Sequence, residues 1–127
     1  MTTSEGRLLH DVLREFGRGQ NFRIARNNTG VAHECAYCDD LHKRHAPKQH
    51  PPYRVVKYGI PGAPDILGIL APSGRVIALE TKSPTGPVTP KQKAYHAMLT
   101  KHGGGVVVVR SMDEAREWMR EIGAEWR

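Results

Sequence analysis

The chain has 127 residues, of which 39% are hydrophobic and 25% charged. These values predict one compact domain with a single hydrophobic core and argue against wholesale disorder. The formal net charge of +6 makes a polyanion a reasonable partner. No apolar run approaches the length of a membrane-spanning helix, and the polar N-terminus shows no secretory signal, so we expect an intracellular protein of the cytoplasm or nucleoid.

The first segment with a clear period is an amphipathic helix. Its apolar residues recur at helical spacing over residues 4–17, and Thr2 with Glu5 would form its capping box. The next segments are expected to be a strand over 22–27, a turn over 28–30, an inserted loop or small lobe over 31–53, a strand over 54–58 and a rigid turn over 59–64. The insert is set apart by its wealth of His, Pro, Lys, Cys and Asp and by its lack of periodicity.

The second half of the chain predicts a hairpin, two helices and a strand between them. The hairpin lies within residues 62–83, with a four-residue connection at 71–74. A helix over 90–102 follows, with Thr89 as N-cap and Pro90 at its first position. The remaining signals are glycines at 103–105, a continuous apolar run at 106–109 typical of a buried strand, and Ser111 with Glu114 as the cap of a last helix. A mixed β-sheet flanked by helices, an α/β fold, is the expected architecture.

Three charged residues interrupt the apolar hairpin: Asp65, Glu80 and Lys82. Side chains alternate along a strand, so Glu80 and Lys82 share one face. If Leu70 pairs with Arg75, the same register places Asp65 opposite Glu80, where two carboxylates would repel each other.

A divalent cation would remove this repulsion, because Mg²⁺ and Mn²⁺ prefer oxygen ligands. The ammonium of Lys82 beside such a cation could orient a water molecule or stabilise charge on a phosphate. Together these groups suit phosphodiester hydrolysis. The competing interpretation is a solvated Glu80–Lys82 pair with Asp65 as a turn residue.

The motif of these residues resembles a known nuclease family. Pro64–Asp65 followed by Glu80-Thr81-Lys82 is similar to the PD-(D/E)xK signature, and the wider context from residue 59 to 115 resembles its VRR-Nuc branch. A looser likeness extends over residues 4–30. The resemblance implies a restriction-endonuclease-like fold and a metal-dependent nuclease.

The resemblance also implies a role for each residue of the motif. Asp65, Glu80 and the backbone carbonyl of Thr81 would bind Mg²⁺ or Mn²⁺, and Lys82 would be the catalytic lysine. Gln92 would reach the site from its helix, although its spacing from Thr89 also fits a capping box. Glu5 would be an N-terminal acid of the site, with the capping partnership as its alternative.

The insert holds a second group of candidate ligands: Cys35, Cys38, His42 and His45. These are ligand types that a tetrahedral structural zinc uses, although the gaps differ from those of common zinc fingers. The alternative is a polar lobe whose histidines contact DNA. The nuclease resemblance does not require this insert.

Basic and polar residues near the motif provide candidate contacts to DNA: Arg26, Asn27, Lys91 and Lys93. We expect a DNA endonuclease that is selective for branched DNA or four-way junctions, because a small domain has little surface for reading a long base sequence. Stand-alone members of the resembled family suggest a homodimer. The alternative function is a non-catalytic DNA-binding module with a zinc-stabilised lobe, and RNA is a third candidate substrate.

Overall fold

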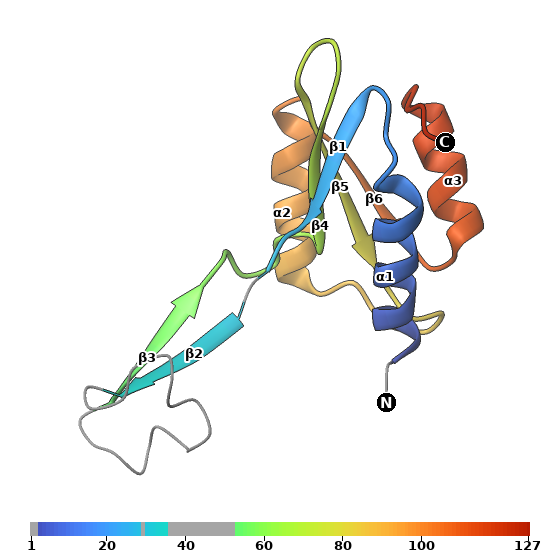
Figure 1. Cartoon of the computed structure of the whole chain (residues 1–127). Helices are drawn as coiled ribbons and strands as arrows, with labels where there is room; N and C mark the ends of the chain where they lie inside the picture. The colour runs from blue at the N-terminus through green and yellow to red at the C-terminus, as the bar shows by residue number, and fades with distance from the viewer. Residues whose placement is uncertain (1–2, 29, 36–52) are drawn as a thin grey trace. The chain divides into compact units, whose positions relative to one another are not determined.

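The computed structural model describes residues 3–28, 30–35 and 53–127. These residues form two compact units, one of Met1–Asn27 with Pro61–Arg127 and the other of Asn28–Ile60. The elements in chain order (Figure 1) are α1 (Ser4–Phe16), β1 (Phe22–Arg26), β2 (Gly30–Cys35), β3 (Tyr53–Tyr58), β4 (Ile66–Leu70), β5 (Arg75–Thr81), α2 (Pro90–Lys101), β6 (Gly105–Val109) and α3 (Met112–Glu121).

The first unit is a four-stranded mixed sheet with helices on both faces. Its strand order is β1-β4-β5-β6, in which β5 and β6 are parallel and the other pairs antiparallel. Figure 1 shows α2 on one face of the sheet and α1 with α3 on the other. The predicted α/β architecture is therefore confirmed for this unit.

The hairpin of β4 and β5 has the register that the sequence predicts. Leu70 pairs with Arg75 and Ile66 with Leu79. The turn between them is closed by a hydrogen bond of 3.0 Å from the backbone N–H of Gly74 to the carbonyl of Leu70. Gly74 has a φ of 75°, a left-handed conformation that glycine adopts without steric cost.

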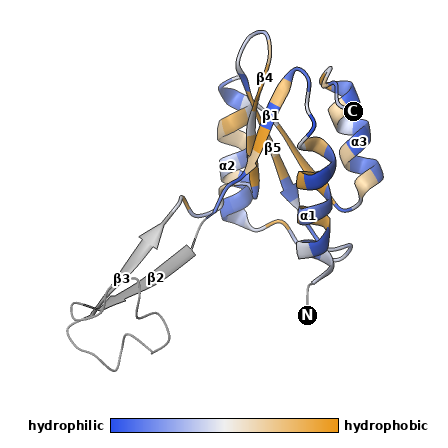
Figure 2. Cartoon of the chain, viewed as in Figure 1, coloured by the Kyte–Doolittle hydropathy of each residue, from blue (hydrophilic) through white to orange (hydrophobic). Residues whose placement is uncertain are grey.

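The core lies between the sheet and the α1/α3 layer. Its buried apolar residues are Leu8, Leu9, Val12, Phe16, Phe22, Ile66, Leu70, Ile77, Leu79, Val109, Ala115, Met119 and Ala124. Full burial of one such large side chain is worth about 1.5–3 kcal/mol. Figure 2 shows apolar colour along β4 and β5 and a mixture of polar and apolar colour along the helices.

Two of the expected helix caps differ from the prediction. The N-cap of α1 is Thr3, whose side chain accepts a hydrogen bond from Gly6, so the predicted Thr2–Glu5 capping box is wrong. In a capping box the side chain of the third helical residue accepts from the N–H of the N-cap residue. In α1 this third residue is Gly6, which has no side chain. At α3, the hydroxyl of Ser111 accepts a hydrogen bond from the N–H of Glu114, as expected for the N-cap. The Glu114 carboxylate, however, accepts from the N–H of Arg110 rather than from that of Ser111.

Strand β6 is not the fully buried strand that its valines predict. It stands last in the strand order, with β5 as its sheet neighbour. Residues 106–108 are consequently only half-buried, while Val109 is fully buried. A continuous apolar run does not distinguish a central strand from an edge strand that a helix partly covers.

The second unit contains β2 and β3 as an antiparallel pair, in which Gly30 faces Tyr58 and Cys35 faces Tyr53. The sequence did not predict strand β2 within the inserted loop or small lobe, although the backbone of β2 is paired along its whole length. The candidate zinc ligands Cys38, His42 and His45 lie outside the described residues, and Cys35 is the last residue of β2. The zinc site stays a prediction.

No helix in the described parts of the chain is long and apolar enough to span a lipid bilayer.

Candidate active site

The carboxylate of Asp65 is fixed at the open end of the β4–β5 hairpin. Its Oδ2 accepts hydrogen bonds from the backbone N–H of Thr81 at 3.0 Å and from the Thr81 hydroxyl at 2.9 Å. The paired ladder begins one residue later, at Ile66. The Asp65 side chain thus supplies the partner that a buried backbone N–H requires.

The turn that carries Asp65 is anchored to two other elements. Asn27, which directly follows β1, donates from its backbone N–H to the carbonyl of Asp65 at 2.7 Å and from its side chain to the carbonyl of Pro64 at 3.1 Å. Gly62 has a φ of 84°, and a Cβ there would lie 2.4 Å from the carbonyl oxygen of Lys91 at the start of α2. The side-chain amide of Asn27 is therefore engaged within the protein, and its contact with DNA stays a prediction.

Glu80 is a buried carboxylate that faces α2. Its side chain is 1% exposed. Gln92 donates from Nε2 to Oε1 of Glu80 at 3.1 Å. The other oxygen, Oε2, has no hydrogen-bond partner among the residues that the structure describes, which is unusual for a buried polar atom.

Gln92 both completes the capping box with Thr89 and reaches the candidate site, the two roles that the sequence analysis left as alternatives. Its Oε1 accepts from the N–H of Thr89 at 2.9 Å while the Thr89 hydroxyl accepts from the N–H of Gln92, which completes a capping box. Its Nε2 is then free to donate to Glu80. The cap fixes the amide so that its donor end faces the carboxylate.

The electrostatic environment of Glu80 disfavours its charge. Burial, the charge of Asp65 and direct contact with that carboxyl raise the pKa of Glu80 to about 8. Glu5 raises it further, whereas the ammonium of Lys82 lowers it. The influences that raise the pKa of Glu80 outweigh that of Lys82, so the protein environment favours the uncharged form of this side chain.

Lys82 and Glu5 flank this pair of carboxylates. Lys82 is 8% exposed, and its backbone N–H donates to the carbonyl of Val109 at 2.9 Å. Glu5 lies in the first turn of α1 and is half-buried. Because Thr3 caps that helix through Gly6, the capping alternative for Glu5 no longer applies.

His96 is a member of this cluster that the sequence interpretation missed. Its side chain is 13% exposed, and its Nε2 lies 3.8 Å from Oε2 of Glu80. Neither atom has a hydrogen-bond partner. Burial, and then the charge of Lys82, lower the pKa of His96. The available signal was its spacing of four residues from Gln92, which places both side chains on one face of α2.

The chemistry of this cluster fits a divalent cation. Among the described residues, no three His, Cys, Asp or Glu side chains gather as a ready-made metal cluster. Mg²⁺ needs no such cluster, because it usually binds one or two carboxylates and keeps several waters. The unpartnered Oε2 of Glu80 and the adjacent carboxylate of Asp65 match that requirement.

The remaining candidate DNA contacts lie at the surface. Arg26 at the end of β1 and Lys91 and Lys93 in the first turn of α2 are exposed or half-buried at their positions. They are available to phosphates, and these contacts stay predictions.

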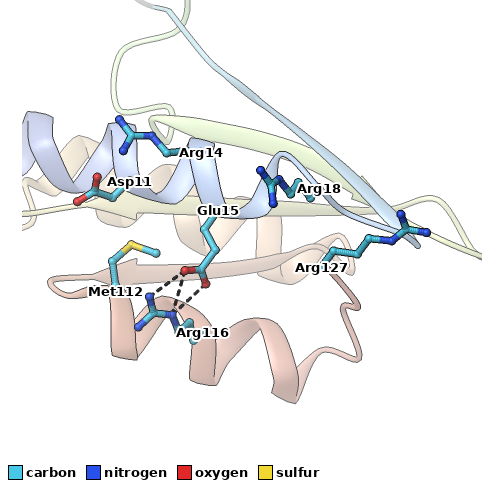
Figure 3. A pocket seen from close by; sticks show the side chains of 7 residues that line it. All are labelled: Asp11, Arg14, Glu15, Arg18, Met112, Arg116 and Arg127. Carbon is cyan, nitrogen blue, oxygen red and sulfur yellow. Dashed lines mark hydrogen bonds and ion pairs between the residues drawn. The ribbon is translucent and has the colours of Figure 1, made fainter.

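A second charged cluster lies between α1 and α3, at a hollow of about 420 Å³ (Figure 3). Arg116 meets the carboxylate of Glu15 there with contacts of 2.8 and 2.9 Å. The hollow is lined by Asp11, Arg14, Glu15, Arg18, Met112, Arg116 and Arg127. It shares no residue with the Asp65–Glu80 cluster.

Comparisons with known proteins identify a family. No curated protein matches the chain significantly, and no solved structure does. The VRR-NUC domain family matches residues 20–113, which include Asp65, Glu80, Lys82 and Gln92 but not Glu5. The chain therefore belongs to the VRR-NUC domain family, a family of nuclease domains.

Proposed function

We propose that this protein is a metal-dependent DNA endonuclease that hydrolyses phosphodiester bonds, with a preference for branched DNA or four-way junctions. One observation carries the proposal. The buried carboxylate of Glu80 lies against Asp65, retains an unpartnered oxygen and has a pKa raised to about 8. A site in which the acids outweigh the single neighbouring ammonium of Lys82 suits an external cation.

The residues of the motif would have distinct roles. Asp65, Glu80 and the backbone carbonyl of Thr81 would hold Mg²⁺ or Mn²⁺. Such an ion polarises a phosphoryl oxygen and lowers the pKa of a bound water. Lys82 would orient the attacking water or stabilise the charge that grows on the phosphate.

Two further residues would support these groups. Gln92 holds the Glu80 carboxylate through the 3.1 Å hydrogen bond. Glu5 adds negative potential from the first turn of α1, where it already raises the pKa of Glu80.

The expected substrate follows from the size and charge of the chain. With 127 residues and a net charge of +6, the protein has basic surface for DNA backbones but little area for reading sequence. Arg26, Lys91 and Lys93 would contact phosphates. A homodimer would present two sites to a symmetric junction.

The second candidate function is a non-catalytic DNA-binding module with a zinc-stabilised lobe. The observation that keeps it in view is the pair of cysteines in the sequence, Cys35 and Cys38. A binding module, however, has no need for buried acids beside Lys82, whose side chain is also nearly buried.

The test is cleavage of linear duplex, single strand, flap, splayed-arm and four-way-junction DNA with Mg²⁺, Mn²⁺ or EDTA. Lys82→Ala should lower the cleavage rate by about 10²–10³-fold, as the loss of one transition-state-stabilising group does, while DNA binding persists. Lys101→Ala is the matched control, since Lys101 lies in the last turn of α2 and is exposed.

Metal-dependent cleavage that Lys82→Ala removes and Lys101→Ala retains would establish the nuclease. Its preferred substrate would follow from the rates on the panel. Binding of the panel without cleavage by the wild type would contradict the proposal and favour the binding module.

A further inference from the structure

His96 and Glu80 face each other with unmet hydrogen-bonding capacity. Nε2 of His96 and Oε2 of Glu80 are 3.8 Å apart, and both atoms are buried without a partner. That distance is too long for a hydrogen bond. A shift of under about 1 Å, within the reach of small side-chain rotations, would bring the two atoms to hydrogen-bonding distance and satisfy both.

The two carboxylate oxygens of Glu80 each face a side chain of α2. Gln92 donates to Oε1, and His96 lies four residues further along α2, so the two side chains lie on one face of the helix. Each carboxylate oxygen has two lone pairs. One hydrogen bond to each oxygen therefore leaves both oxygens able to bind a cation.

We propose that His96 is a positioning residue of the candidate active site, donating from Nε2 to Oε2 of Glu80 and thereby fixing the carboxylate in its cation-binding orientation. The inference rests on the proposed metal-dependent function. In this proposal His96 acts through Glu80, because its Nε2 faces Oε2 of that carboxylate at 3.8 Å. Partners of this kind orient metal-binding groups, and their loss typically costs 10–100-fold in metal affinity or activity.

A purely structural role for His96 explains less. None of the residues of α2 is fully buried, and an apolar side chain would fill the same space without an unpartnered nitrogen. The imidazole nitrogen instead faces the free oxygen of Glu80 at 3.8 Å.

The experiment compares three variants of the full chain. His96→Leu removes the donor at similar volume, and His96→Gln keeps an amide nitrogen near the place of Nε2. His102→Leu is the matched control, because His102 is exposed at the end of the same helix. The dissociation constant for Mn²⁺ is measured from the electron paramagnetic resonance signal of free Mn²⁺, and cleavage rates are measured over a range of Mn²⁺ concentrations.

We expect His96→Leu to weaken Mn²⁺ binding by about 10–100-fold. Its cleavage rate should recover at saturating Mn²⁺, because the ligands themselves are intact. His96→Gln should bind close to the wild-type value, and His102→Leu should match the wild type.

Two outcomes would overturn the inference alone, in a wild type that binds Mn²⁺ and cleaves DNA. One is unchanged affinity in His96→Leu, and the other is a loss in His96→Gln as large as that in His96→Leu, which would show that ring shape matters rather than the donor. A wild type that neither binds Mn²⁺ nor cleaves any DNA would instead overturn the proposed function together with the inference.

Discussion

Two glutamates of this fold meet opposite electrostatic environments. Glu15 on α1 pairs with Arg116 on α3 through contacts of 2.8 and 2.9 Å (Figure 3). This hydrogen bond is the main influence that lowers the pKa of Glu15. Glu80 on β5 has the acidic neighbours Asp65 and Glu5, and its pKa is raised to about 8.

The comparison distinguishes a carboxylate that forms an ion pair within the protein, Glu15, from a buried carboxyl whose neighbours are mainly acidic, Glu80. At Glu15 the protein supplies the cation, and the contact joins two helices. At Glu80 the chain places a buried carboxyl beside other acids, and among the described residues its Oε2 has no hydrogen-bond partner. Burying an ionised carboxylate is unfavourable unless it is paired, and the divalent cation that we propose would supply the missing partner.

The largest expected effect comes from removing the Glu80 charge. We expect Glu80→Gln to abolish cleavage and yet to stabilise the metal-free protein at pH 8, by roughly 4 kcal/mol at about 1.4 kcal/mol for each unit by which the pKa is raised. The amide oxygen introduced by this substitution would still accept the hydrogen bond from Gln92. Chemical denaturation of both proteins at pH 5 and pH 8 measures the difference.

The sign of this pH dependence follows from the raised pKa. Between the ordinary value of 4.5 and about 8, the folded state keeps a proton on Glu80 that the unfolded state has lost. The free energy of unfolding of the metal-free wild type therefore falls as the pH rises through this window. Mn²⁺ should reverse the fall, and Glu80→Gln should lack it. Equal pH profiles for the two proteins would show that burial of Glu80 carries no such cost.

A smaller effect is expected at Gln92, whose two contacts can be separated. Gln92→Glu keeps an acceptor for the N–H of Thr89 but loses the donor to Glu80, whereas Gln92→Ala loses both. We expect cleavage to fall by about tenfold or more in each variant. At pH 5, only Gln92→Ala should lose stability, by about 1 kcal/mol for the lost hydrogen bond to the N–H of Thr89.

The measurements are the cleavage rate and the free energy of unfolding at pH 5. A loss of stability in Gln92→Glu as large as that in Gln92→Ala would mean that the hydrogen bond to Glu80, rather than the cap, holds the start of α2. Unchanged cleavage in both variants would remove Gln92 from the site.

The smallest expected effect is at Glu15. Glu15→Gln should lower the melting temperature slightly at pH 7 and leave cleavage unchanged, because partly exposed ion pairs contribute little. Since the pKa of Glu15 is lowered, its contribution is present above the ordinary value of 4.5 and is lost on acidification through the folded-state pKa. The melting temperatures of the two proteins, measured at pH 7 and pH 3, should therefore converge in acid.

Asp113→Asn is the matched control for that measurement. Asp113 contacts the same guanidinium at 3.1 Å, but its side chain is 95% exposed. It should change the melting temperature less than Glu15→Gln does. A decrease in cleavage for Glu15→Gln would indicate that the α1/α3 contact also supports the active site.

The β4–β5 hairpin shows that local sequence pattern can predict the register of neighbouring strands. Strand alternation and the turn at residues 71–74 predicted the register in which Leu70 pairs with Arg75, and the structure confirms it. The same reasoning did not find β2, because its pairing with β3 depends on residues distant in the chain. It also took β6 as a buried strand, since hydrophobicity alone does not reveal a position at the end of the strand order.

The sequence by itself determined where the candidate site residues fall along the chain. Asp65 precedes one strand, Glu80 and Lys82 stand at the end of the next, and Gln92 is the third residue of a capped helix. These follow from spacing and from capping rules that act over a few residues. Only the tertiary structure decided that Glu80 is buried against α2, that Asn27 anchors the turn before Asp65, and that His96 faces the unpartnered oxygen. Burial and pKa depend on which distant elements pack together, and no local pattern contains that information.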